Sequence, residues 1–173
     1  PSNEIVEAIV KALSSSCPER AMAGWSRRFR VAIQSEDPRT GKNFIWHLFQ
    51  ARPGGGASSG GDGWSSIGEW HSVGGLKFGS LEVAEARFPL HFRHHEFRAG
   101  SGGDGQYRGG LGVSLDLVLE TEKVAKGNTA GDGARHGPCG MLGGEDGKPH
   151  HYRLLSEGRA PRVLRTKEVG VEL

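Results

Sequence analysis

Residues 28–50, which read RFRVAIQSEDPRTGKNFIWHLFQ, predict a β-hairpin around which the other elements are placed. Polar and apolar residues alternate from Arg28 to Gln34, the two-residue period of a strand, and a second strand is expected from Asn43 to Gln50. Between them lies the turn sequence DPRTG at 37–41, in which proline presets one backbone angle and glycine permits a positive one. The second strand has apolar residues on both faces, so we expect it to occupy a central sheet position.

Helix and strand patterns flank this hairpin. Apolar residues recur every three or four positions after Ser2 or Asn3 and predict a helix that ends between Ser14 and Pro18. A short helix fits residues 80–88, although a strand is the alternative there. Alternating patterns predict strands at residues 90–98, 113–120, 151–155 and 162–166. Six or seven strands with one or two helices predict an α+β fold, mainly antiparallel β with long glycine-rich loops.

The composition indicates a loop-rich globular chain. Glycine accounts for 29 of the 173 residues, about 17% against an average of roughly 7%. The glycines have no three-residue period, which excludes collagen, and no window approaches the roughly 18 apolar residues of a membrane-spanning helix. With 22 basic and 20 acidic residues, the charge is too even to indicate a nucleic-acid partner. Two distant cysteines, Cys17 and Cys139, exclude a disulfide framework and favour a reducing, cytoplasmic compartment.

The two ends of the chain suggest a piece of something larger. It begins at Pro1, which is not a translation start, and it stops after an apolar run at Leu173. We therefore expect residues 1–173 to form a single fragment of a larger subunit. The glycine- and serine-rich stretch 53–63, PGGGASSGGDG, is a candidate internal boundary and is expected to be either a mobile loop or a loop in contact with other backbone.

A second glycine-rich loop, GSGGDGQYRGGLG at residues 100–112, contains seven glycines and runs into a strand. Phosphate-binding loops lead into a helix instead, which argues against a P-loop or a dinucleotide site. Tight turns or close approach of another backbone explain most of the glycines, with Tyr107 and Arg108 packed or paired nearby. The alternative is a loop that lines a site or a subunit interface.

Other polar clusters suggest chemistry less directly. In an extended strand, His91 and His95 would share one face with Arg93 between them, and His94 would lie on the other; the intervening cation disfavours a metal site and favours surface histidines. The pair at residues 150–151 alternates in the same way. Cys139, close to His136, is interpreted as a structural cysteine, with a nucleophile as the alternative. Arginines at 27, 28 and 30 are interpreted as a solvated strand edge that resists pairing.

One longer segment carries a family signature. It covers residues 82–119, EVAEARFPLHFRHHEFRAGSGGDGQYRGGLGVSLDLVL, in which an acidic-apolar run ends in a proline and a strand leads into SGGDGQYRGGLG. This segment resembles the C-terminal half of the hydantoinase B/5-oxoprolinase family, which includes the large subunits of acetone and acetophenone carboxylases. Gly100 stands where the family has an aspartate. The DPRTG turn and the glycine-rich segment 137–147 resemble the family as well.

The resemblance implies a function for the whole subunit. The chain would be the C-terminal portion of an ATP-dependent cyclic-amide hydrolase that acts with an ATP-binding hydantoinase A-type subunit and with the remainder of its own subunit. The alternatives are an ATP-dependent ketone carboxylase, a non-catalytic assembly domain, or a metal enzyme built on the histidines. The isolated chain is expected to be inactive, with no nucleic-acid or membrane partner.

Cofactors and site residues follow from the same resemblance. ATP with Mg²⁺ and a divalent metal would belong to the whole complex. None is expected in this piece, because the family's Asp- and His-containing metal motif is absent from the sequence, as is its terminal glycine segment. Catalytic residues are not identified. The candidates for a substrate or interface loop are Tyr107, Arg108, Gly109 and Gly110, with Arg108 expected to pair with an anion.

Overall fold

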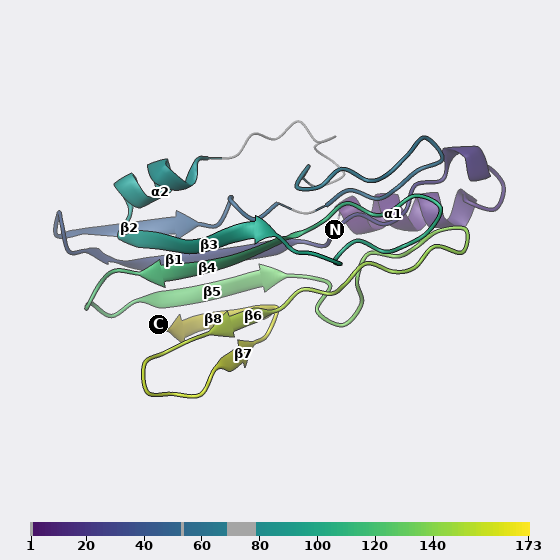
Figure 1. Ribbon diagram of the computed structural model, residues 1–173. Coiled ribbons are helices and arrows are strands. Elements are labelled where there is room, and N and C mark those ends of the chain that lie inside the picture. The colour runs from purple at the N-terminus through teal and green to yellow at the C-terminus, as the bar shows by residue number, and fades with distance from the viewer. Residues whose placement is uncertain (1, 53, 69–78) are drawn as a thin grey trace.

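The computed structural model describes residues 2–52, 54–68 and 79–173; Pro53, at the start of the low-complexity stretch, and Pro1 lie outside it. Within this part of the chain the fold is α+β and mainly antiparallel, as the sequence predicts (Figure 1). The elements are α1 (Ser2–Leu13), the 3₁₀ helix η1 (Pro18–Arg20), β1 (Phe29–Asp37), β2 (Lys42–His47), α2 (Leu81–Arg87), β3 (Leu90–Phe97), β4 (Val113–Leu119), β5 (Lys126–Gly131), β6 (Tyr152–Leu154), β7 (Arg162–Leu164) and β8 (Lys167–Glu172).

The strands form one four-stranded sheet and two hairpins. The sheet has the order β2-β1-β5-β8, with every neighbouring pair antiparallel. The hairpin β3-β4 pairs over its full length, and the short hairpin β6-β7 pairs Tyr152 with Leu164. Figure 1 shows the strands gathered at one end of the molecule, while the long loops run together toward the other end, where α1 lies.

The DPRTG turn forms as expected and ties the hairpin to α2. Gly41 adopts a positive φ of 67°, and the Asp37 carboxylate accepts a hydrogen bond from the Arg39 backbone N–H at 2.9 Å. The Arg39 guanidinium also hydrogen-bonds this carboxylate, and that contact holds the pKa of Asp37 below its ordinary value. A further nitrogen of Arg39 donates to the Glu85 carbonyl in α2 at 3.2 Å.

The position of the hairpin in the sheet corrects two expectations. β2 is an edge strand rather than a central one, because β1 lies between β2 and β5. Its two faces differ sharply: Trp46 is 3% exposed, whereas its neighbour Ile45 is 64% exposed. β1 therefore has no free edge, and the arginines at its start are not edge guards; Arg27 instead pairs with Glu7 of α1.

The core lies between the hairpin β1-β2 and the hairpin β3-β4. Ile33, Trp46, Leu48 and Leu90 are all at most 5% exposed and form one buried cluster. Partly buried side chains of β3 and β4 pack against it, and the Phe92 ring meets the Trp46 ring at 6.2 Å in an edge-on geometry. Apolar burial of this kind is the main stabilising term of the fold.

Helix α1 packs with its apolar face outward. Glu7 is 6% exposed, whereas Ile5, Ile9 and Leu13, spaced four residues apart, are 59%, 54% and 56% exposed. Residues four apart lie on one face of a helix, so these three side chains form a continuous apolar stripe. We call them the α1 stripe.

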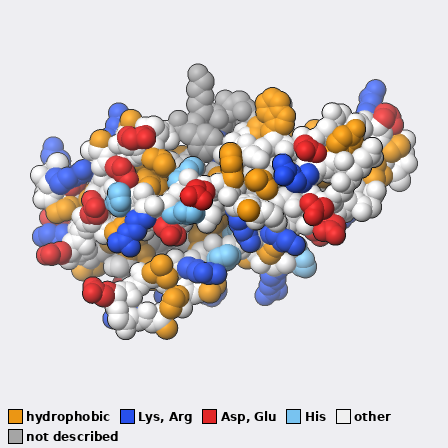
Figure 2. Space-filling model, viewed as in Figure 1, with side chains coloured by type: hydrophobic (Ala, Val, Ile, Leu, Met, Phe, Trp, Pro, Cys, Tyr) orange, Lys and Arg blue, Asp and Glu red, His pale blue; other side chains and the backbone are white. Residues whose placement is uncertain are grey.

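Within the described residues, no helix is both long and apolar enough to cross a membrane. On the face in view, Figure 2 shows basic and acidic side chains interspersed rather than segregated. This distribution agrees with the even charge balance of the sequence.

Candidate functional site

Three glycine-rich segments are stacked against one another beside the sheet. Their contacts are backbone to backbone: the Gly110 N–H donates to the Gly55 carbonyl at 2.9 Å, and the Glu145 N–H donates to the Asp104 carbonyl at 2.7 Å. The stretch beginning near residue 54 is therefore a backbone-contact loop, one of the two forms expected of it. The segments comprise residues 54–63, 100–112 and 137–147.

Two positions in this stack show why glycine is needed. A Cβ atom on Gly110 would collide with the Trp64 carbonyl and lie 3.0 Å from the Gly55 nitrogen. One on Gly103 would collide with the Glu145 carbonyl. Neither glycine has a positive φ. Glycine is therefore needed at these two positions because it has no side chain, and not because of its backbone freedom.

A cleft of about 1660 Å³ runs along this stack and over the inner face of the strands. Typical small-molecule pockets occupy roughly 300–1,000 Å³, so the cleft is large for a single small ligand. Of the loop residues singled out from the sequence, Tyr107, Gly109 and Gly110 line it. Arg108 is exposed; its backbone N–H donates to the Asp62 carboxylate at 2.8 Å, and its side chain does not line the cleft.

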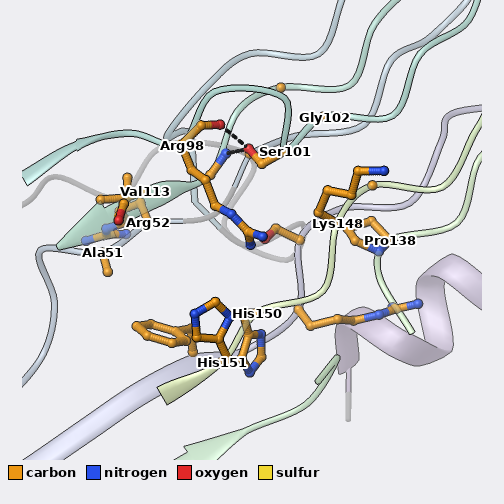
Figure 3. Close-up of a pocket in the computed structure, with 18 of the residues that line it drawn as sticks. Ala51, Arg52, Arg98, Ser101, Gly102, Val113, Pro138, Lys148, His150 and His151 are labelled. Carbon is orange, nitrogen blue, oxygen red and sulfur yellow. Dashed lines mark hydrogen bonds between the residues drawn. The ribbon is translucent and has the colours of Figure 1, made fainter. Parts of the chain in front are cut away.

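Basic side chains meet at one part of the cleft. Figure 3 shows Arg98 reaching in from the end of β3 toward His150 and His151, with Arg52 and Lys148 on the surrounding wall. Sequence reasoning did not single out Arg98. The pairing of β3 with β4 could have indicated it, because this pairing places Arg98 beside Gly112, at the end of the glycine-rich loop 100–112.

A short hydrogen-bond network fixes Arg98. Its Nη1 donates to the Pro149 carbonyl at 2.7 Å, and its own carbonyl accepts from the Ser101 hydroxyl at 2.7 Å. The Ser101 oxygen accepts in turn from the Gly112 N–H at 2.9 Å, and the Ser101 carbonyl accepts from the Lys148 N–H at 2.9 Å. Two loops distant in sequence are thereby joined beside the guanidinium.

The two histidines of the cleft have lowered pKa values. Burial is the main cause for His150, reinforced by His151 and Arg98 and opposed by Asp132. For His151, burial again comes first, followed by the charges of Arg153 and Arg98. Both imidazoles are therefore neutral at pH 7, unless a negative charge arrives next to them.

Aromatic packing holds the His150 ring in place. Phe29 and Tyr152 stack with their ring centres 4.4 Å apart and their planes 3° apart, and His150 meets both edge-on at 5.1 and 5.4 Å. Tyr152 is 5% exposed, and its hydroxyl oxygen accepts from the Arg30 N–H at 3.2 Å. Burial raises the pKa of Tyr152 to about 12.

The histidines of β3 are arranged differently from the expected alternation. The pairing of β3 with β4 shifts between Phe92 and His94, so Arg93 is an extra residue in a β-bulge. In the resulting register His91 and His94 share one face, and His95 lies on the other with Phe92. The expectation that His91 and His95 share a face is therefore wrong, because a bulge reverses the alternation beyond it.

Each of these histidines has its own local partner. A ring nitrogen of His95 lies 2.8 Å from the Gln50 carbonyl oxygen, and Nδ1 of His91 lies 3.2 Å from the Glu85 carboxylate. Nδ1 of His94 lies 3.7 Å from the carboxylate of Glu96. Across residues 2–52, 54–68 and 79–173, no three His, Cys, Asp or Glu side chains gather in a way that could hold a metal ion. His91, His94 and His95 thus do not converge on a common point.

Cys139 has a structural environment. Its thiol donates to the Glu7 carboxylate at 3.2 Å, and burial, followed by this contact, raises the thiol pKa. His136 is exposed and forms no hydrogen bond with the sulfur in the described structure. The nucleophile alternative needs a lowered thiol pKa, and these contacts supply the opposite.

The fold and the site define a class of protein: an α+β chain in which stacked glycine-rich loops, one of them reading RGGLG, border a cleft with a basic wall. A family model described as hydantoinase B/oxoprolinase matches residues 1–172, and the chain belongs to this family. The resemblance seen in the sequence is confirmed, and with it an enzyme-associated role at the level of the family.

Curated relatives share these sequences over only part of their length. The chain is 31% identical over 119 residues to the beta subunit of the caprolactamase of Pseudomonas jessenii. The aligned region covers 68% of this chain and 20% of that relative. It is 32% identical over 148 residues to the 5-oxoprolinase PfmaA of Pestalotiopsis fici, covering 84% of this chain and 11% of the relative. The chain thus spans about a fifth or less of the length of these two proteins.

A solved structure has the same fold. The nucleotide-free structure of acetone carboxylase, from a study of ATP-dependent acetone carboxylation, superposes with a TM-score of 0.67 over 84% of this chain and 20% of the other. Sequence identity between the two is 22%, so this likeness concerns the fold alone.

Proposed function

We propose that this chain contributes to an ATP-dependent hydrolase of cyclic amides, acting as part of a hydantoinase B-type subunit together with an ATP-binding hydantoinase A-type subunit. The observation that carries the proposal is the family match over residues 1–172, together with the stacking of its RGGLG loop beside the cleft. A cytoplasmic location is part of the same proposal.

The names of the relatives favour amide hydrolysis over carboxylation. Caprolactam, 5-oxoproline and hydantoin are all cyclic amides, and the matching relatives named for them reach 31% and 32% identity, or 25% for one subunit of a putative D-/L-hydantoinase of a Pseudomonas species. A ketone carboxylase is the second candidate, and the acetone carboxylase fold supports it, at 22% identity.

The proposed chemistry divides between chains. Phosphorylation of the amide oxygen turns a poor electrophile into one that water can attack, and ATP with Mg²⁺ and a divalent metal would be held elsewhere in the complex. This chain would shape the cleft through its glycine stack, with Tyr107, Gly109 and Gly110 on its wall. Arg108, exposed at the rim of the same loop, would pair with an anionic group across a subunit contact.

Contacts with other polypeptide would use the α1 stripe. Exposed large apolar side chains in a continuous row mark interaction surfaces more often than isolated ones do. The rest of the hydantoinase B-type subunit is the proposed occupant, since the matched relatives are about five or more times longer than the region they share with this chain. The same stripe supports a non-catalytic assembly domain as the remaining alternative.

A substrate panel tests the proposal. The native complex containing this chain is purified and its ATP hydrolysis is measured with 5-oxoproline, hydantoin, caprolactam, or acetone plus bicarbonate. We expect stimulation by at least one cyclic amide, and none by the isolated chain. Stimulation only by acetone with bicarbonate would move the function to carboxylation. If deletion of this chain prevents assembly, while substitutions that line its cleft leave the rate unchanged, the chain would have an assembly role.

A further inference from the structure

We propose that Arg98, His150, His151 and Arg153, which we call the basic cluster, form a binding site for a small oxyanion of the phosphate or carboxylate kind. The four residues line the same cleft. The site does not depend on the reaction proposed above, because it rests on the groups that this chain itself presents.

The geometry provides an oriented donor. One nitrogen of the Arg98 guanidinium is fixed on the Pro149 carbonyl at 2.7 Å, and Arg98 enters the cleft beside the two histidines (Figure 3). A guanidinium has five N–H donors, so one anchoring bond leaves the rest of its planar fork for a ligand. In the part of the chain that the structure describes, Arg98 forms no salt bridge with a carboxylate.

The charges around Arg98 reinforce one another. Arg98 lies close enough to both histidines to lower their pKa values, and Arg153 acts on His151 in the same direction. The acidic group that opposes this effect at His150 is Asp132, and its carboxylate lies 3.2 Å from the Lys167 ammonium. The cluster therefore holds two cationic side chains, Arg98 and Arg153, beside two histidines whose charged form they disfavour, and a bound anion would offset this effect.

A second feature is one buried polar atom of the cluster. The Nε2 atom of His150 is buried and has no hydrogen-bond partner among the described residues. Buried polar atoms are nearly always hydrogen-bonded, so one without a partner requires an explanation. Burial lowers the pKa of His150, and an anion nearby would make its protonation less costly.

This environment selects the class of ligand. Arginine binds the oxygens of phosphate and carboxylate through paired, charge-assisted hydrogen bonds. A neutral amide offers one carbonyl oxygen and no charge, and would not offset the positive charges of Arg98 and Arg153. Phosphate and carboxylate share the chemistry required here, and the experiment separates them.

The test uses the 173-residue chain with inorganic phosphate, acetate or chloride at one ionic strength. Calorimetry measures binding, and NMR titration of the imidazole C–H signals follows the pKa values of His150 and His151. We expect saturable binding of phosphate or acetate, a rise in both histidine pKa values at saturation, and neither effect with chloride. Tighter binding of phosphate would assign a phosphoryl ligand, and tighter binding of acetate a carboxylate.

Variants separate the cluster from general charge. Arg98→Gln and His151→Gln should each weaken oxyanion binding by about tenfold, while Arg98→Lys retains part of it. The matched control is Arg87→Gln at the exposed end of α2, which does not line the cleft and should bind as the unmodified chain does. Circular dichroism confirms folding, and His151, which is exposed, provides a variant that does not perturb the core. Absence of saturable binding, or histidine pKa values that saturating phosphate and acetate leave unchanged, would overturn the proposal.

Discussion

Arg27 and Glu7 form a two-point ion pair that fastens helix α1 to the segment preceding β1. Nη1 of Arg27 lies 2.7 Å from Oε2 of Glu7, and Nη2 lies 2.7 Å from Oε1. The Glu7 side chain is 8% exposed, and its other hydrogen-bond partner is the Cys139 thiol. The helix is thus anchored through its polar face, and this geometry turns the α1 stripe outward.

The Arg27–Glu7 pair should be important for stability. Arg27→Met leaves a buried carboxylate without its cation, and removal of one partner from a buried pair costs about 3 kcal/mol. Urea unfolding of the variant measures this loss of unfolding free energy. Arg28→Met, at the exposed neighbouring position, is the matched control and should change stability by less than about 0.5 kcal/mol. Equal effects of the two substitutions would show that the pair contributes little.

The glycine stack predicts opposite outcomes for two glycines of the RGGLG sequence. Gly110→Ala places a methyl group against the Trp64 carbonyl, so backbone must move, at a cost of about 2 kcal/mol or more. Gly112→Ala meets nothing closer than the Ser101 hydroxyl at 3.8 Å and should be neutral or stabilising by about 0.5 kcal/mol. Thermal unfolding of both variants decides between them. A Gly110→Ala protein as stable as the unmodified chain would show that the loops are not packed this closely.

Tyr152 should make the fold sensitive to alkaline pH. Its pKa is raised to about 12 in the folded chain, against roughly 10 in the unfolded one. The stability that this group contributes is fully present below pH 10 and is lost as the pH rises toward 12. The cause is that the unfolded state releases the tyrosine proton at a lower pH than the folded state does. The expected loss of unfolding free energy is on the order of 2 kcal/mol. Unfolding measured from about pH 9 to pH 12 in a Tyr107→Phe background, where Tyr152 is the sole tyrosine, tests this. The decline should be smaller in Tyr152→Phe, in which the raised pKa of the Cys139 thiol still contributes to it.

The α1 stripe should matter for assembly and not for folding. Ile9 is 54% exposed, so Ile9→Lys should change the unfolding free energy by less than about 0.5 kcal/mol. In the native complex the same substitution would bury a charge in the apolar contact with the rest of the subunit, and limited proteolysis should show that α1 is cleaved faster. Glu19→Lys, exposed and close to the helix but off the stripe, is the control. A complex carrying Ile9→Lys that is cleaved as slowly as the unmodified one would assign the stripe no role in the contact.

Local patterns in the sequence predicted the elements whose information lies within a few residues. The hairpin of β1 and β2 and strand β4 follow from turn chemistry and alternation, and helix α2, for which a strand was the alternative, follows from its apolar spacing and the proline after it. The two strands that form the hairpin β6-β7 were predicted as well. In each case the sequence signal lies within the element itself or directly beside it.

Strands β5 and β8 could not be predicted in this way. β5 reads KGNTAG and has almost no apolar residues to alternate, and β8 reads KEVGVE with a glycine at positive φ. Both become strands because they pair with neighbouring strands of the sheet. These neighbours are distant in sequence, so local patterns do not reveal the pairing. The edge position of β2 was missed for the same reason: apolar residues on both faces suggest burial, yet Ile45 and Phe49 stay exposed.

The candidate site was predicted in part. The sequence identified the glycine-rich loop, and Tyr107, Gly109 and Gly110 do line the cleft. It did not indicate Arg98, whose position depends on a strand register and on a hydrogen bond to Pro149 from a distant loop. The bulge at Arg93 was also invisible, because an extra residue in one strand is defined only by its partner.

The most direct test of the proposed function counts two products in one reaction. The native complex containing this chain is supplied with ATP and the cyclic amide that stimulates it, and phosphate and ring-opened product are quantified over time without bicarbonate. We predict that the two accumulate in equal amounts and that neither forms when ATP or the amide is left out. Ring opening that proceeds without ATP, or phosphate release that requires bicarbonate and a ketone, would contradict an ATP-driven amide hydrolase.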